Sequence, residues 1–129
     1  MKRSSFYLPS IFCVITFVLL VLPGHEFPKS KFFDIKGLDK IVHTLMFFTL
    51  TWLFCRPFKA AELPLAEKRK WFLSVAVLAV AYGVIMEFVQ LYFVPFRSFE
   101  LADILVDTLG SLSAYIYCRY KFAETVIKK

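Results

Sequence analysis

The chain has 129 residues, of which 59% are hydrophobic, and a formal net charge of +6. Soluble domains contain roughly 45–50% apolar residues, and here the apolar residues occur in blocks rather than at amphipathic spacing. The composition therefore excludes an ordinary soluble protein and predicts a single small membrane domain over residues 1–129. The basic residues stand at the ends of the apolar blocks, which indicates contact with anionic lipid headgroups and no nucleic-acid partner.

The first apolar block covers residues 7–23 and follows Lys2 and Arg3. A basic start and an apolar core also describe a signal peptide, but no small-x-small cleavage site follows. Pro23 and Gly24 together form a typical helix stop. We therefore predict a retained first span that ends there.

Three more apolar blocks follow, at residues 38–55, 71–94 and 101–118. Each has the length and composition of a membrane-crossing helix. The connection over residues 56–70 is the most basic part of the chain, and its residues 60–70 have the composition of a short surface helix. The predicted fold is an all-α membrane protein with four transmembrane helices.

The distribution of lysine and arginine predicts the orientation of these helices. The N-terminus, the second connection and the C-terminal tail carry two, five and four of the sixteen basic residues, against four and one in the other two connections. Because cytoplasmic segments carry the excess of positive charge, both termini are expected in the cytoplasm.

Polar residues gather near the predicted outer ends of three spans. They are Asp39, Lys40, His43, Glu87, Gln90, Arg97, Asp103 and Asp107. Glu87 lies about two turns inside an otherwise apolar helix, where an ionisable group is costly and needs a partner or a function. Asp39 and His43 are four residues apart, as are Asp103 and Asp107, so each pair shares a helix face. We expect one cluster in the outer leaflet, in which Arg97 and His43 are the counter-charges of Glu87.

Small residues follow the same faces. Ala76, Ala79 and Gly83 lie on the stripe that leads to Glu87, and Gly110 continues the stripe of the fourth-span carboxylates. Small residues at this spacing let membrane helices approach closely. This pattern predicts that the third and fourth spans pack stripe to stripe, although small residues are also common filler in apolar helices.

The polar residues stand in four motifs. These are Asp39-Lys40-x-x-His43, Tyr82-Gly83-x-x-x-Glu87-x-x-Gln90, the single Arg97, and Asp103-x-x-x-Asp107-x-x-Gly110. As a set, and with Leu22-Pro23-Gly24 and Pro28, they resemble the VanZ-like family of small bacterial membrane proteins, which is named for a protein linked to teicoplanin resistance. The resemblance implies residence in the bacterial inner membrane and a role in the cell envelope. It supplies no reaction, and the family usually has Asn where this chain has Asp107.

Three functions remain open for the predicted cluster, and ion transport is disfavoured because the polar residues lie at one side of the membrane only. In a structural role, Lys40 and Arg97 neutralise carboxylates and hold the helices together. In a catalytic role, His43, Glu87 and Asp103 are the candidate catalytic residues. In a binding role, the cluster holds a lipid-linked or other envelope ligand.

The residue types suit either chemical role. One imidazole and three carboxylates are compatible with Zn²⁺, Mn²⁺ or a Mg²⁺–phosphate complex, and His43 or Glu87 also suits a metal-free general base. The candidate binding residues are Asp39, Lys40, Gln90, Arg97 and Asp107, among which the two cations suit a phosphate or carboxylate. The sequence does not fix the substrate, a cofactor, the metal or the oligomeric state.

The predicted topology is tested by labelling single cysteines placed at Ser30 and at Glu62 with a membrane-impermeant reagent. The two positions are expected to react from opposite sides of the membrane, because the first and second connections are predicted on opposite sides. Labelling from the same side would reject the four-span topology.

Overall fold

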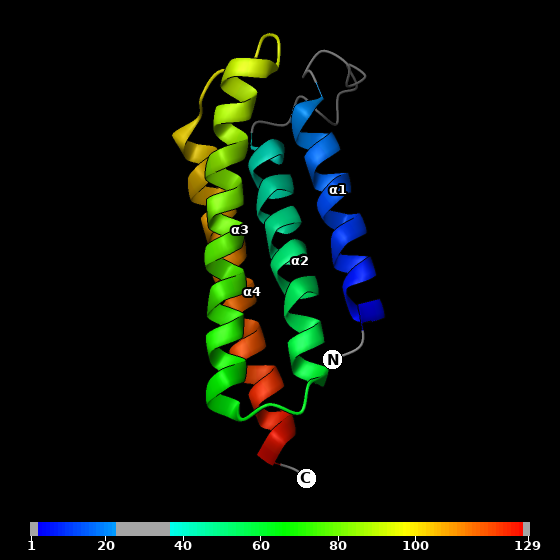
Figure 1. Ribbon diagram of the computed structural model, residues 1–129. Coiled ribbons are helices and arrows are strands. Elements are labelled where there is room, and N and C mark those ends of the chain that lie inside the picture. The colour runs from blue at the N-terminus through cyan, green and yellow to red at the C-terminus, as the bar shows by residue number, and fades with distance from the viewer. Residues whose placement is uncertain (1–2, 23–36, 128–129) are drawn as a thin grey trace.

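The computed structural model of the chain describes residues 3–22 and 37–127. All regular secondary structure in these residues is helical, as predicted. A short 3₁₀ turn at Arg3–Phe6 leads into four α-helices. They are α1 (Tyr7–Val21), α2 (Leu38–Ala60), α3 (Leu65–Phe93) and α4 (Leu101–Ile127). Successive helices run in opposite directions along one bundle, with α4 behind α3 and α2 in the view of Figure 1.

Three of the helices are long and apolar enough to cross a membrane, namely α2, α3 and the part of α4 up to Lys121. The first helix has 15 residues, which corresponds to about 22 Å and is shorter than a usual span. The chain is thus a multi-pass membrane protein by length and composition. The predicted helix stop at Pro23-Gly24, and Pro28 beyond it, lie outside the described residues.

The connection between α2 and α3 is shorter than the sequence predicts. The second apolar block is expected to end at residue 55, but α2 runs through Arg56 and Pro57 to Ala60. The surface helix expected over residues 60–70 is wrong as a separate element, because residues 65–70 form the first turns of α3. A helix does not have to stop where the apolar sequence stops, because Lys, Arg, Ala and Leu are all good helix formers.

Close packing joins α4 to α2 more than to α3. A Cβ atom built on Gly110 would overlap the backbone oxygen of Thr44, so the two backbones are in contact at this point. A Cβ on Gly83 would lie 3.0 Å from Oδ2 of Asp107. The predicted stripe-to-stripe packing of the third and fourth spans is therefore wrong in part: Gly83 does face α4, but Gly110 faces α2.

Two buried apolar clusters fill the bundle at different heights. The upper cluster, nearer the end where α2 begins, contains Leu20, Met46, Phe47 and Met86, which come from α1, α2 and α3. The lower cluster contains Cys55, Phe58, Phe72 and Cys118, which come from α2, α3 and α4. Between them lie Ala76 and Ala79, which are buried on α3.

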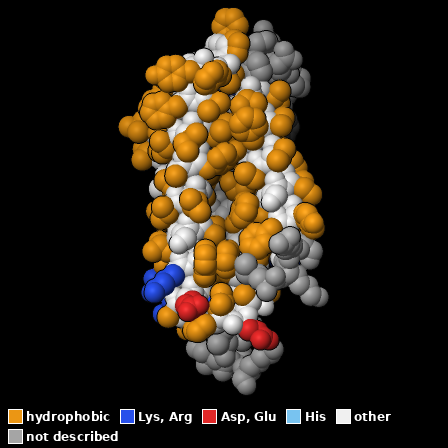
Figure 2. Space-filling view, in the orientation of Figure 1, with side chains coloured by type: hydrophobic (Ala, Val, Ile, Leu, Met, Phe, Trp, Pro, Cys, Tyr) orange, Lys and Arg blue, Asp and Glu red, His pale blue; other side chains and the backbone are white. Residues whose placement is uncertain are grey.

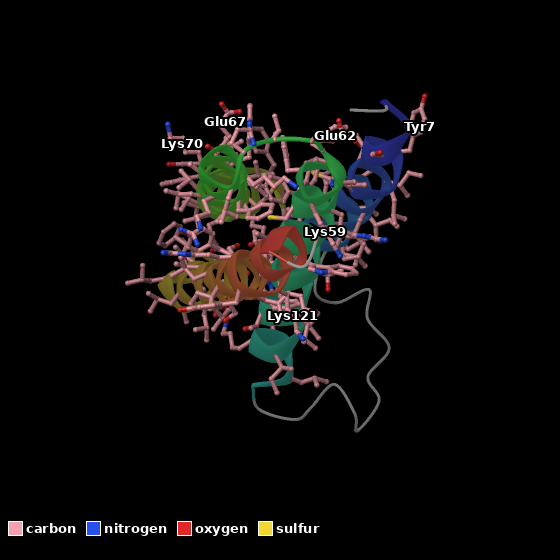
Figure 3. All side chains as sticks on the ribbon, turned by 90° about the horizontal axis from the view of Figure 1, so that it is seen from below. Tyr7, Lys59, Glu62, Glu67, Lys70 and Lys121 are labelled. Atoms are coloured by element: carbon pink, nitrogen blue, oxygen red, sulfur yellow. The ribbon has the colours of Figure 1, made fainter. Side chains whose placement is uncertain are left out.

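Charged side chains occupy the end of the bundle where α2 ends and α3 begins, which we call the basic end. Figure 3, a view onto this end, shows Lys59, Lys70 and Lys121 around it, together with Glu62 and Glu67. Lys68 is buried, and its ammonium donates a hydrogen bond to the backbone oxygen of Lys59 at 3.0 Å. A cation at the last carbonyls of α2 is favourable because these carbonyls lack helical partners.

Replacing Gly110 by Ala is expected to destabilise the bundle by about 1–3 kcal/mol, because the new methyl group overlaps the α2 backbone, which has no side-chain freedom to yield. Thermal unfolding in detergent measures the effect. Leu109→Ala is the matched control, since Leu109 is exposed on the same helix. A Gly110→Ala protein as stable as the control would contradict the close α2–α4 contact.

Candidate functional site

A cluster of charged side chains lies at the opposite end from the basic end, where α2 and α4 begin. We define this polar cluster as Asp39, Lys40, His43, Glu87, Glu100, Asp103 and Asp107. At its centre, the ammonium of Lys40 donates hydrogen bonds to Asp103 and, at 2.6 Å, to Oε2 of Glu100. A third carboxylate, that of Asp39, lies 3.5 Å away. One ammonium group thus forms ion pairs with three carboxylates, of which only that of Asp103 is buried.

One helical turn deeper, His43 pairs with Asp107. The two residues are buried, and Nδ1 of His43 lies 3.0 Å from Oδ1 of Asp107. With Asp107 ionised, Nδ1 is the donor, which fixes the ring and leaves Nε2 directed to the Asp39 side, 3.8 Å from Oδ1 of Asp39. This arrangement resembles the carboxylate-oriented imidazoles that serve as bases or metal ligands.

Glu87 and Gln90 lie on the inner face of α3, and both are buried. Oε2 of Glu87 accepts a hydrogen bond of 2.9 Å from the backbone N–H of Glu100, just before α4 begins. Glu87 also interacts electrostatically with Asp103, His43 and Asp107. Gln90 points to α1 instead, where its side-chain amide donates to the backbone oxygen of Leu20 at 2.8 Å.

Arg97 does not take the position expected for it. No ion pair or side-chain hydrogen bond joins it to Glu87 or to any other described residue. Its Nε atom is buried without a hydrogen-bond partner among the described residues. Nor does an ion pair within 4.0 Å join His43 to Glu87 in this part of the chain, so neither expected counter-charge pairs directly with Glu87.

Glu100 belongs to the polar cluster, although the sequence did not predict it as a site residue. Its carboxylate bonds to Lys40 and its backbone N–H bonds to Glu87, so it connects α2, α3 and the start of α4. The sequence feature that could have indicated it is its place directly before a helix, where the helix dipole favours an acidic residue. Its backbone oxygen also accepts the first hydrogen bond of that helix, from Asp103.

A metal ion has one candidate position among the described residues. Asp39, His43 and Asp103 each offer a ligand atom, and these atoms lie within 4.8 Å of one another. The mixture of imidazole and carboxylate suits Zn²⁺ or Mn²⁺. However, the ammonium of Lys40 already bonds to both carboxylates, so an ion would compete with a resident cation.

The family comparison covers this whole site. The VanZ/LLP1 family matches residues 5–123. The chain belongs to the VanZ/LLP1 family. No curated protein and no solved structure matches the chain.

The resemblance to VanZ-like proteins drawn from the polar motifs is therefore confirmed. Every member of the polar cluster lies inside the matched residues. Asp107, where the resemblance led us to expect Asn, is the residue that pairs with His43. A carboxylate at this position orients the imidazole as a hydrogen-bond acceptor, whereas an amide could also donate to it.

Replacing Lys40 by Met is expected to destabilise the bundle by about 2 kcal/mol, because buried Asp103 loses its cation. The double variant Lys40→Met with Asp103→Asn is expected to recover about half of this loss, since the unpaired charge is gone as well. Thermal unfolding of purified protein in detergent gives both values.

Lys70→Met is the matched control, because Lys70 is exposed at the basic end. Equal stabilities of the Lys40→Met and Lys70→Met proteins would show that the Lys40 pairs contribute nothing. A double variant that is less stable than the single one would show that Asp103 has another partner.

Proposed function

We propose that this VanZ/LLP1 protein binds the polar headgroup of an envelope amphiphile at the polar cluster, in the outer leaflet of the bacterial inner membrane. The observation that carries the proposal is a charged cluster with a buried interior and an accessible rim. Asp103, Asp107, His43 and Glu87 are almost completely buried, whereas the side chains of Asp39 and Glu100 are 56% and 48% exposed. A cluster that served packing alone would not need an accessible side.

The aromatic residues at the end of α3 support the depth of this site. Tyr92, Phe93 and Phe96 are 72%, 79% and 95% exposed. Exposed aromatic rings of this kind suit the membrane interface and are unfavourable in water. Phe93 lies six residues beyond Glu87, which corresponds to about 9 Å along the helix. With these rings at the interface, the polar cluster lies below the headgroup level, where an amphiphile reaches it from the side.

The charges around the rim define the type of headgroup. Asp39 and Glu100 offer acceptors, and the side chain of Lys40 is partly exposed. The lysine suits a phosphate, and the carboxylates suit amine or hydroxyl groups. The site thus fits a phosphorylated headgroup that also carries hydrogen-bond donors.

A structural role is the second candidate, and the pairing within the cluster favours it. Lys40, His43 and Gln90 all have protein partners, so these residues link the helices without a ligand. Such contacts stabilise membrane bundles by about 1 kcal/mol or less each. The two candidates differ in what happens when a cluster residue is changed without loss of folding.

Glu87→Gln is the variant that separates them, because it keeps the size of the side chain and its acceptor for the Glu100 N–H while removing the charge. Purified protein is incubated with labelled, phosphate-bearing envelope lipids, with and without a chelator. Wild-type protein is expected to retain lipid saturably, and Glu87→Gln to lose about tenfold in affinity, because a neutral acceptor holds the backbone of the rim residue Glu100 less firmly.

Glu67→Gln is the control, because Glu67 is exposed in the first turn of α3 at the basic end. A chemically changed lipid would identify an enzyme, and dependence of that change on the chelator would identify a metal. Undiminished retention by an abundant, folded Glu87→Gln protein would make the cluster structural. In cells, the resemblance to a teicoplanin-resistance protein makes tolerance of glycopeptide antibiotics the phenotype to measure.

A further inference from the structure

We propose that a groove between α1, α2 and α3 binds one hydrocarbon chain of a membrane lipid, at mid-height of the bundle. The groove has a volume of about 210 Å³. Its walls include Cys13 of α1, Leu50 and Phe54 of α2, and Val75, Leu78 and Tyr82 of α3. This site is separate from the polar cluster and does not depend on the function proposed for that cluster.

The groove lies between the two apolar clusters of the core. On each helix, the upper cluster (Leu20, Met46, Phe47, Met86) lies nearer the polar cluster than the groove does. Phe58 and Phe72 of the lower cluster lie nearer the basic end. Each end of the groove is therefore flanked by an apolar cluster of the core, and we expect an occupant to enter from the side.

The volume selects the kind of occupant. An apolar cavity of about 150 Å³ accommodates benzene, so 210 Å³ accommodates a chain segment of somewhat more than six carbon atoms. One turn of a helix about 10 Å wide and 5.4 Å high fills roughly 400 Å³. A helix of a second copy does not fit, whereas an extended hydrocarbon chain does.

The chemistry of the walls excludes water as the occupant. The groove wall exposes almost no polar surface: the hydroxyl of Tyr82 lies 3.4 Å from that of Thr16, and the hydroxyl of Thr51 is buried. A stable water in a cavity needs two or more polar partners. Figure 2 looks onto this face, where hydrophobic side chains cover the middle of the bundle and charged ones gather near its lower end.

The position of the groove predicts which part of a lipid it holds. At mid-height, the groove is at the depth of the distal parts of acyl chains. The surrounding lipid is already apolar, so binding gains no hydrophobic free energy and depends on dispersion contacts with the fixed walls. The expected preference over bulk lipid is therefore modest.

The test uses wild-type protein in vesicles of phosphatidylethanolamine and phosphatidylglycerol, in which one acyl chain carries a diazirine near its terminal methyl group. After illumination, adducts are mapped by mass spectrometry. Groove-lining residues are expected to be labelled about threefold more than equally exposed residues of the same helices, because a few extra dispersion contacts give a preference of this size.

Leu78→Trp is expected to abolish this excess by filling the mouth of the groove. Val77→Trp is the matched control, because Leu78 and Val77 are adjacent and are 68% and 58% exposed, but only Leu78 lines the groove. Ala79→Leu, which narrows the groove at a buried wall position, is expected to act like Leu78→Trp.

Labelling in proportion to exposure in wild-type protein would overturn the proposal. So would an equal loss of labelling in the Leu78→Trp and Val77→Trp proteins. Protection of the groove residues, together with protein–protein cross-links across this face, would identify a second copy of the chain as the occupant and would also overturn it.

Discussion

The bundle depends on one constraint, which is that carboxylates buried between apolar helices need partners on the facing helix. Asp103 and Asp107 are one turn apart on α4, and their partners Lys40 and His43 are nearly one turn apart on α2. The two pairs fix the register of α2 against α4. A shift by one turn would leave one buried carboxylate without a partner, which is strongly unfavourable in a membrane.

The other helices are attached to this pair by single polar contacts. The carboxylate of Glu87 ties α3 to the residue before α4, and the amide of Gln90 ties α3 to the end of α1. Below these contacts, α1 meets its neighbours through apolar side chains and the Tyr82–Thr16 contact. The groove lies in this apolar part of the contact, where Cys13 of the short helix α1 faces α2 and α3.

The sequence predicted the helices and the polar faces well, because both follow from local spacing. The pairs at residues 39 and 43 and at residues 103 and 107 share helix faces whatever the tertiary structure is. The position of Arg97 relative to Glu87 was not predictable in the same way, because Arg97 lies in a connection that has no periodic spacing. The role of Gly110 was assigned to the wrong neighbour, since a stripe of small residues indicates close approach but not which helix approaches.

The polar cluster contains more carboxylates than cations, and this imbalance bears on whether its role is structural. Five carboxylates face one lysine and one histidine, and the guanidinium of Arg97 forms no ion pair with any of them among the described residues. A bundle selected only for stability would do better with matched pairs or with apolar residues, because each uncompensated charge at this depth is costly. An excess of acceptors at the accessible rim is instead what a headgroup rich in hydrogen-bond donors requires. This imbalance supports ligand binding over a purely structural role for the polar cluster.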